Sequence, residues 1–318
     1  MTQIGYWLAS EEHPPLDLVR NARRAEEEGF GFAMIADHFH PWIEAQGNAP
    51  FVWGVLGGIA ASTERIEIGT GVTCPLIRTH PAIVAHAAAT AAAMLPGRFT
   101  LGVGTGENLN EHVLGDRWPA PDERVELLEE AIEVMRLLWQ GGEQTHRGKH
   151  YTVDHATLYT LPDEPIPIAV AAAKENAARL AGRAGDALVN TVPDEEIVRT
   201  YREAGGDGPT YGQVRLCWAE DPEEAKETTF RLWRHAGIGG TTSQELPRPS
   251  DFDAAAESVT KEMAVEGVPC GPDPEPVLEL VREWEQAGFD RIALHQVGPD
   301  QEGFFRFWER ELRPKLSS

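Results

Sequence analysis

The sequence predicts an α/β fold, a single closed (β/α)8 TIM barrel with insertions after strands 4 and 7. Short apolar runs alternate with segments of helical periodicity eight times, and such alternation is typical of a parallel sheet. A chain of 318 residues has the length at which eight units of this kind close into a barrel. No break in composition is long enough to be a linker, so we expect one domain over residues 1–318.

The expected strands are short apolar runs. The second run, Phe30–Ala36, is too continuous for a half-exposed strand and suits a parallel sheet that is buried on both faces. A proline-rich approach precedes the fifth run, and prolines mark the boundaries of regular elements. In chain order, the eight strands are Ile4–Ala9, Phe30–Ala36, Ile66–Val72, Phe99–Gly104, Ile166–Ala172, Ala187–Asn190, Gln213–Trp218 and Arg291–Val297.

The expected helices show apolar residues at steps of three and four. The clearest is Asp122–Gln140, in which Val125, Leu128 and Ile132 share one face. The first helix stops at Gly29, a residue that commonly ends helices. The helices in chain order are Pro14–Gly29, Phe51–Ser62, Pro81–Leu95, Asp122–Gln140, Glu175–Ala184, Asp194–Ala204, Pro222–His235, Pro274–Ala287 and Phe304–Leu316.

Two segments interrupt the alternation. His146–Leu161 predicts a small hairpin, and Gly237–Ser258, which is rich in Gly, Thr and Pro, predicts a long loop. Insertions of this length in a compact domain are commonly lids or substrate loops, and we expect that role for these two.

The charge balance limits the partners. The formal net charge is −23, and such an excess of acid argues against sequence-independent binding to nucleic acid or to an anionic membrane. Only five of the 28 basic residues are lysine, and this composition suits work in high salt as well as in ordinary conditions. The longest apolar stretch, Pro81–Leu95, is too short and too alanine-rich to span a bilayer.

The cysteines and histidines point away from disulfides and metals. Cys74, Cys217 and Cys270 are odd in number and far apart, which favours free thiols in a reducing compartment. The N-terminus has no basic segment followed by an apolar run, so we expect a cytoplasmic protein. His146 and His150 have a spacing that would suit a metal on a helix, but the predicted hairpin makes them surface residues, and we expect no metal.

Polar and aromatic residues follow the predicted strands. Because reactive residues of such barrels lie at the C-terminal ends of the strands, these positions predict one mouth with a polar and aromatic lining. They are Ser10, Asp37–Trp42, Thr73–Pro75, Thr105–Asn110, Ala173–Lys174, Asn190–Thr191, Trp218 and His295–Gln296.

His38 and Glu107 are the candidates for acid–base chemistry. His38 shares a crowded loop with Trp42, and histidine has a proton affinity near neutral pH. Glu107 follows a glycine-dense turn after the fourth strand, and a glutamate partly removed from water there suits proton transfer. The structural alternatives are a helix-capping Asp37 beside a buried His38, and a Glu107 that only complements a helix dipole. The crowding of the mouth favours the functional interpretation.

The glycines at 102–106 have GxGxG spacing rather than GxGxxG, and they follow the fourth strand rather than the first. We therefore do not expect them to bind a dinucleotide. Glycines at such a position instead allow a flat ring to approach the backbone.

Two motifs carry a resemblance to a known family: DHFxPW at 37–42 and GVGTGExLNE at 102–111. With them, the sequence resembles the luciferase-like flavin and deazaflavin oxidoreductases, and more closely the F420-dependent glucose-6-phosphate dehydrogenase group. Further matches at 69–72, 181–186 and 295–297 extend the likeness over nearly the whole chain. The resemblance implies a (β/α)8 barrel, usually a homodimer, that binds coenzyme F420 at its C-terminal mouth.

The resemblance also implies roles for individual residues. His38 and Glu107 would handle protons and Trp42 would help hold the reacting centre, during hydride transfer between a sugar (phosphate) or alcohol carbon and C5 of the deazaflavin. Which of His38 and Glu107 is the base stays open. A cis peptide bond near Gly71 is also a family feature. The positions that would bind the cofactor are Asp37, Val72, Cys74, Thr105, Gly106, Asn110, Ala173 and Lys174.

Departures from the family pattern bear on the substrate. Ala173–Lys174 stands where relatives have a glycine pair facing the F420 phosphate, and Lys174 could add a charge there. The basic residues that hold the sugar phosphate match Asp194 and Glu266 here, and acids disfavour a phosphate. We therefore expect a substrate other than glucose 6-phosphate: a neutral alcohol, another sugar or a reducible small molecule. Residues that could rebuild a phosphate site are Arg248, Lys261 and Arg78.

Two competing functions stay open. An FMN-dependent luciferase-like monooxygenase would carry a tightly bound yellow flavin. A carrier barrel without catalysis would bind cofactor and never turn over, although His38 and Glu107 at adjacent strand ends argue against it.

Overall fold

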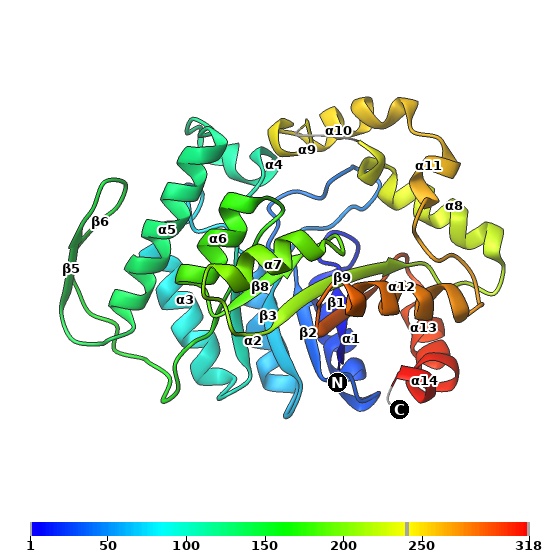
Figure 1. The fold of residues 1–318 in the computed structure, drawn as a ribbon, viewed down its shortest axis with the longest axis horizontal. Coiled ribbons are helices and arrows are strands. Elements are labelled where there is room, and N and C mark those ends of the chain that lie inside the picture. Colours follow the sequence, from blue (N-terminus) through cyan, green and yellow to red (C-terminus); the bar gives the residue numbers. More distant parts are fainter. Residues whose placement is uncertain (1, 239–241, 317–318) are drawn as a thin grey trace.

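The computed structural model describes residues 2–238 and 242–316, and its centre is a closed barrel of eight parallel strands (Figure 1). Neighbouring barrel strands pair in parallel, and the pairing of the first with the last closes the barrel. The predicted (β/α)8 barrel is therefore confirmed. Around the barrel the strands are β1 (Gln3–Leu8), β2 (Phe32–Ile35), β3 (Glu67–Thr70), β4 (Phe99–Val103), β7 (Ile168–Ala171), β8 (Ala187–Asn190), β9 (Thr210–Leu216) and β10 (Arg291–Gln296).

Helices surround the barrel and bury one apolar face each. Several begin with proline in the first turn, where its fixed φ suits the helix and no hydrogen bond is lost. In the first helix, Leu18, Ala22 and Ala25 are fully buried. The helices are α1 (Pro15–Glu27), α2 (Val52–Ser62), α3 (Pro81–Met94), α5 (Pro121–Leu138), α6 (Glu175–Ala184), α7 (Glu195–Glu203), α8 (Pro222–Trp233), α12 (Glu275–Gln286), α13 (Gln301–Phe307) and α14 (Arg313–Leu316).

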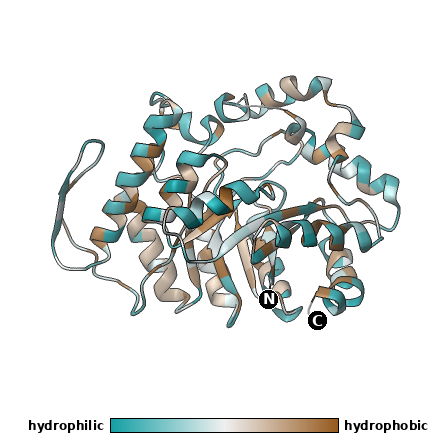
Figure 2. Cartoon of the chain, viewed as in Figure 1, coloured by the Kyte–Doolittle hydropathy of each residue, from teal (hydrophilic) through white to brown (hydrophobic). Residues whose placement is uncertain are grey.

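The apolar residues form two layers of core. The larger lies between strands and helices, and a smaller one, which includes Trp7, Phe32 and Tyr211, fills the barrel interior. Figure 2 shows the corresponding pattern, with hydrophobic residues on the strands and hydrophilic residues on the outer faces of the helices. The barrel is thus a packed core, and ligands must bind at one of its ends.

The predicted hairpin exists, as β5 (Gln144–Arg147) and β6 (Thr152–Ala156). It lies beside α5, at the left edge of Figure 1, and Tyr151 between its strands donates to the carbonyl oxygen of Leu76, in the loop after β3, at 3.1 Å. Glu130 of α5 holds it there by accepting the backbone N–H groups of His150 and Tyr151, each at 2.9 Å. The expected role of this insertion as a lid or substrate loop stays a prediction.

The predicted loop at Gly237–Ser258 is wrong in its described part, because most of it is helical. It contains α9 (Thr242–Glu245), α10 (Pro249–Ala255) and a 3-10 turn, and α11 (Lys261–Val265) follows; residues 239–241 lie outside the described residues. These helices lie above the end of the barrel that also carries α4 (Asn108–Glu111) (Figure 1). Phe252, Ala256 and Ala264 are buried, but α9, α10 and α11 have only four, seven and five residues, too few for helical periodicity to be detected in the sequence.

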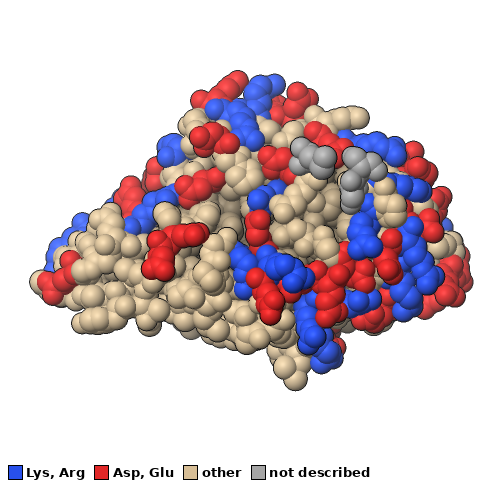
Figure 3. All heavy atoms as spheres, turned by 90° about the horizontal axis from the view of Figure 1, so that it is seen from below, with Lys and Arg blue, Asp and Glu red and all other residues tan. Residues whose placement is uncertain are grey.

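No helix in the described ranges is long and apolar enough to cross a membrane. Figure 3, which shows the molecule from below, has basic and acidic side chains next to each other over much of the face. The excess of acid is therefore not gathered into one continuous patch on this side.

Candidate active site

The loop after β2 begins with a buried charge cluster. Arg78 donates from Nη2 to Asp37 Oδ1 and from Nε to Glu111 Oε1, both at 3.1 Å. Thr73 donates to the second oxygen of Asp37 at 2.9 Å. Burial raises the pKa of Glu111, an effect that Arg78 only partly offsets. Arg78 is thus committed to two carboxylates, and the suggestion that it rebuilds a phosphate site is not supported.

His38 comes next in the loop and is held in one tautomer. Its Nδ1 lies 3.2 Å from the carbonyl oxygen of His40, and a carbonyl only accepts, so Nδ1 carries the proton. In the neutral ring, Nε2 then has the lone pair. This nitrogen lies 3.6 Å from Oε1 of the buried Glu11, whose other oxygen has no partner in the described chain.

Trp42 forms the wall beside His38. The two ring centroids are 5.0 Å apart, and on its other side Trp42 stacks on His235 at 5.3 Å. Phe252 of α10 meets Trp42 edge-on at 5.4 Å. The helices α9, α10 and α11, which together form the excursion after β9, therefore complete the aromatic wall. The excursion also contacts α4, because Asn108 donates to the carbonyl of Glu245.

Asn110 joins the loops after β2 and β4. Its Oδ1 accepts the backbone N–H of Phe39 at 2.9 Å and of His40 at 3.1 Å, so the amide orientation is fixed. Its Nδ2 is buried and has no acceptor among the described residues. A buried donor without an acceptor is costly, which marks it as a group that a ligand can satisfy.

Glu107 lies at the entry to the short helix α4. It is half-buried, and its carboxylate has no hydrogen bond or ion pair with any described residue. It is the N-cap residue of α4 and makes no side-chain hydrogen bond to the helix, so the alternative role, a carboxylate that complements the helix dipole, stays open. Strands β2 and β4 flank β3, so His38 and Glu107 follow strands separated by one and not adjacent strands as expected.

The turn before Glu107 packs tightly on the loop after β3. Gly106 has φ +70°, and a Cβ there would lie 2.6 Å from Cys74 Sγ. Cys74 is buried, and burial raises the pKa of its thiol, so it stays protonated and inert. Val72 follows the cis peptide bond Gly71–Val72, which the resemblance implied. Thr105, half-buried, lies in the same turn.

Ala173 and Lys174 lie exposed at the end of β7, directly before α6. Lys174 has no ion pair with any described residue, whereas Lys149, Lys226 and Lys261 each pair with a glutamate. The N–H groups of the first turn of α6 and the Lys174 ammonium could together hold an anion.

Several predicted substrate positions have structural roles instead. Asp194 caps α7, accepting from the backbone N–H of Glu196 at 2.9 Å. Glu266 is exposed at the end of α11. Arg248 pairs with Asp251 and Lys261 pairs with Glu227, so neither supports the suggested phosphate site.

Sequence reasoning missed a second buried network across the mouth. Glu12 accepts from Trp233 Nε1 at 2.5 Å and from the backbone N–H of Gly298 at 2.7 Å, and His295 Nε2 lies 3.3 Å from it. Gln213 lies 2.9 Å from the other nitrogen of His295. Glu11 and Glu12 follow β1 directly, so the strand-end rule that selected Ser10 should have included them.

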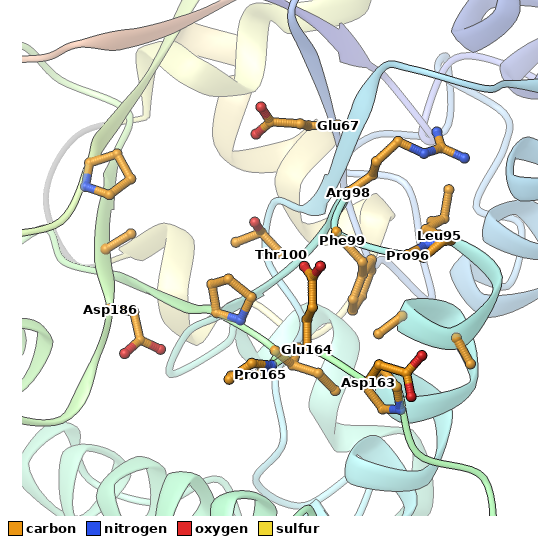
Figure 4. A pocket seen from close by; sticks show the side chains of 18 of the residues that line it. Glu67, Leu95, Pro96, Arg98, Phe99, Thr100, Asp163, Glu164, Pro165 and Asp186 are labelled. Carbon is orange, nitrogen blue, oxygen red and sulfur yellow. The ribbon is translucent and has the colours of Figure 1, made fainter.

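A cavity of about 520 Å³ lies at the opposite end of the barrel, where the strands begin (Figure 4). Glu67 and Phe99, the first residues of β3 and β4, lie in its wall. Its arginines are already engaged: Arg291 pairs with Glu67, and Arg98 donates to the carbonyl of Ile66. We therefore place the candidate site at the mouth and not in this cavity.

In the described ranges, no three His, Cys, Asp or Glu side chains cluster in a way that could hold a metal ion. His146 lies 3.0 Å from Glu130, and His150 lies 3.5 Å from Glu126. The two histidines of the HxxxH spacing thus meet carboxylates of α5 separately.

Comparison with known proteins extends the sequence match to full-length relatives. The chain is 34% identical to the F420-dependent glucose-6-phosphate dehydrogenase of Segniliparus rotundus, over 99% of this chain and 98% of the relative. The enzyme of the same description from Nocardia farcinica gives the same identity and coverage. A solved structure of an F420-dependent secondary alcohol dehydrogenase with an F420-acetone adduct superposes with TM-score 0.90 at 29% identity, covering 98% of both chains.

A second solved structure, a coenzyme F420 dependent tetrahydromethanopterin reductase from Methanopyrus kandleri, shares the fold with TM-score 0.80 at 21% identity, covering 99% of both chains. The family of luciferase-like monooxygenases matches residues 1–291. The resemblance drawn from the DHFxPW and GVGTGExLNE motifs is confirmed, and the chain belongs to the luciferase-like family.

Proposed function

We propose that this protein is an F420-dependent oxidoreductase that transfers a hydride between a sugar (phosphate) or alcohol carbon and C5 of the deazaflavin. The full-length relatives above are named F420-dependent dehydrogenases, and they support this cofactor. The observation that carries the proposal is that His38 Nε2 and the Glu107 carboxylate are at one mouth, neither with a hydrogen bond to the described chain.

The residues of the mouth fit a flat ring with polar edges and a phosphate-bearing tail. The buried Nδ2 of Asn110 is a donor that a ring carbonyl can accept from. Lys174 and the first turn of α6 offer positive charge and N–H groups for a phosphate. Asp37 and Cys74 are already held by protein contacts, so we propose that they shape the cradle for the ring. When bound, F420 supplies the hydride acceptor.

The side chains divide the proton chemistry. We propose His38 as the group that takes the hydroxyl proton, because its Nε2 holds the lone pair and Glu11 can stabilise the imidazolium that forms. Trp42 packs beside the His38 ring and restricts its orientation. Glu107, half-buried and unpaired, would handle the second proton, at the cofactor.

The proposal is tested by titrating the purified protein with F420 and with FMN, following the quenching of tryptophan fluorescence. We expect tight F420 binding and weak FMN binding. Preference for FMN would make an FMN-dependent luciferase-like monooxygenase the better description. F420 binding without turnover on any alcohol or sugar would instead favour a carrier barrel.

Variants of the two proton-handling residues test the mechanism. His38→Ala and Glu107→Gln should lower kcat by about 10²–10⁴-fold, the usual contribution of general acid–base catalysis. F420 affinity should stay within a few-fold of the wild type. His86→Ala, an exposed histidine on α3, is the matched control and should change neither quantity. Equal loss of activity in the control would point to an effect on folding.

We further propose that the chain works as a single domain and a homodimer in the cytoplasm. The three cysteines are free thiols, as expected in a reducing compartment. Light scattering on the purified protein would give the dimer mass, and a monomer mass would contradict the proposed state.

A further inference from the structure

The arginine at the mouth end of β9, Arg215, has no hydrogen bond or ion pair with any described residue. Side chains of a strand alternate between its two faces, so Tyr211, Gln213 and Arg215 share one face. Tyr211 belongs to the core inside the barrel, and Gln213 contacts His295, whose ring lies 6.3 Å from that of Trp7 in the same core. Arg215 therefore points inward, one step closer to the mouth.

The guanidinium rests on an aromatic surface. Its central carbon lies 5.2 Å from the ring centroid of Trp233, a favourable position for a cation on an indole face. Trp233 cannot swing away easily, because its Nε1 donates to buried Glu12. Burial, followed by the charges of Arg215 and His38, lowers the pKa of the neighbouring His235, which is therefore neutral. Arg215 and His38 thus both lower the pKa of His235, whose ring stacks on Trp42.

No described residue forms a hydrogen bond or ion pair with Arg215, although it is only half-exposed. Every other arginine in the described ranges that is not exposed has such a partner; they are Arg24, Arg78, Arg98, Arg124, Arg136, Arg234, Arg291 and Arg313. The residues outside the described ranges carry no aspartate or glutamate side chain. The five donors of this side chain therefore have no acceptor among the described residues.

A partly buried charge without a hydrogen-bond acceptor is unfavourable, and an arginine cannot avoid this cost by losing its proton. In this place the charge faces the mouth, beside the wall that holds His38. We infer that Arg215 binds an anionic group, a carboxylate or a phosphate, on the substrate. This inference rests on the proposed function, because the anion belongs to the molecule whose carbon reacts.

Arg215→Met removes the charge and keeps much of the side-chain volume. Arg231→Met, an exposed arginine of α8 without a partner in the described chain, is the matched control. Inorganic phosphate and acetate are titrated separately into the protein without cofactor at low ionic strength, with tryptophan fluorescence as the readout. We expect at least one anion to bind the wild type and Arg231→Met, and to bind Arg215→Met about 30-fold more weakly or worse. Equal anion affinity in Arg215→Met and the wild type would overturn the inference.

Turnover assays then identify the anion. Substrates are compared in pairs, glucose 6-phosphate with glucose and lactate with 2-propanol, in the wild type and in Arg215→Met. We expect the ratio of kcat/KM for the charged member to that for the neutral member to fall about 30-fold, through KM, in one of the pairs. A fall in the sugar pair would identify a phosphate, and a fall in the acid pair a carboxylate. An unchanged ratio in both pairs would contradict the inference.

The F420 affinity of Arg215→Met shows whether Arg215 binds the substrate or the cofactor. Arg215→Met should bind F420 within about threefold of the wild type, and a larger loss would mean that Arg215 holds the cofactor and not the substrate. If the wild type binds the test anions through Arg215 but never turns over, the proposed function fails while the anion site stands.

Discussion

Asn110 Oδ1 accepts the backbone N–H of Phe39 at 2.9 Å, across 71 residues of sequence. The same oxygen accepts from the next N–H, that of His40, so one amide holds the loop that carries His38. Asn110 lies three residues after Glu107, in α4. The loop that carries His38 and the one that carries Glu107 are therefore tied to each other at this point.

Asn110→Ala should destabilise the protein and reduce turnover together. It leaves two backbone N–H groups without their acceptor, at a cost of about 1–3 kcal/mol in the free energy of unfolding. Urea unfolding and kcat on the same preparations measure both effects. Asn108→Ala, which loses one bond to the Glu245 carbonyl, is the control and should retain activity. Similar losses of kcat in both variants would show that the tie has no special role.

Arg78→Met should be strongly destabilising. Arg78 lies between Asp37 and Glu111, and its removal leaves two buried carboxylates without their cation. Breaking a buried pair in this way costs about 3–5 kcal/mol. Arg248→Met, which breaks the exposed pair with Asp251, should leave the free energy of unfolding within error. Chemical denaturation gives the free energy of unfolding of both variants. Equal values for Arg78→Met and Arg248→Met would show that the buried charge cluster is not important for folding.

Glu12 makes the free energy of unfolding depend on pH in the acid range. Burial alone would raise its pKa, but the contacts with His295, His13 and Trp233 outweigh this effect and lower it below the ordinary 4.5. A carboxyl with a lowered pKa contributes stability above its unfolded-state pKa and loses it as the pH falls through the folded-state pKa. Glu12 therefore stabilises the protein at neutral pH and contributes less below about pH 4.5.

Glu12→Gln should flatten this dependence. Between pH 7 and pH 4, the free energy of unfolding should fall less in Glu12→Gln than in the wild type, as measured by urea titrations at each pH. Glu133→Gln, an exposed glutamate of α5, controls for the loss of one charge and should follow the wild type. A steeper fall in Glu12→Gln than in the wild type would refute the assignment.

Gly106→Ala should lower Tm by more than the strain of its positive φ alone would. Gly106 and Gly115 both have positive φ, +70° and +85°, so alanine is strained at either by about 1 kcal/mol. At Gly115 a Cβ meets nothing within 4 Å, whereas at Gly106 it meets Cys74 Sγ at 2.6 Å. We expect a larger drop in Tm and a weaker F420 affinity for Gly106→Ala. Equal effects would mean that Cys74 yields without cost.

The sequence predicted the positions of those residues that lie in the barrel strands or directly after them. Continuous apolar runs located all eight strands, because strands buried on both faces need no polar residues. The strand-end rule then brought His38, Trp42, Glu107 and Asn110 to one mouth. Their shared location could be predicted because parallel strands place their C-terminal ends together.

The remaining features depend on contacts between distant segments. Arg78 was suggested as a phosphate ligand, but its partner Glu111 lies 33 residues away and gives no local signal. Arg215 looked like any strand residue, since only the absence of an acceptor around it is informative. Phe252 stabilises the excursion after β9 through Trp42, more than two hundred residues earlier, so local periodicity could not reveal the helices there.

The excursion after β9 contacts the rest of the barrel through side chains and single hydrogen bonds. Phe252 packs on Trp42, Asn108 donates to the Glu245 carbonyl, and Asp253 accepts from the backbone N–H of Glu44 at 3.2 Å. Arg124 of α5 also donates to Gln244 at 3.0 Å. Phe252 of the excursion supplies one side of the aromatic wall at Trp42, while Asn110 and Lys174 belong to the loops after β4 and β7. Evolution, or a protein engineer, can therefore exchange this segment as a cassette. A chimaera that receives the segment of another family member would acquire a different substrate range while its coenzyme preference is inherited unchanged.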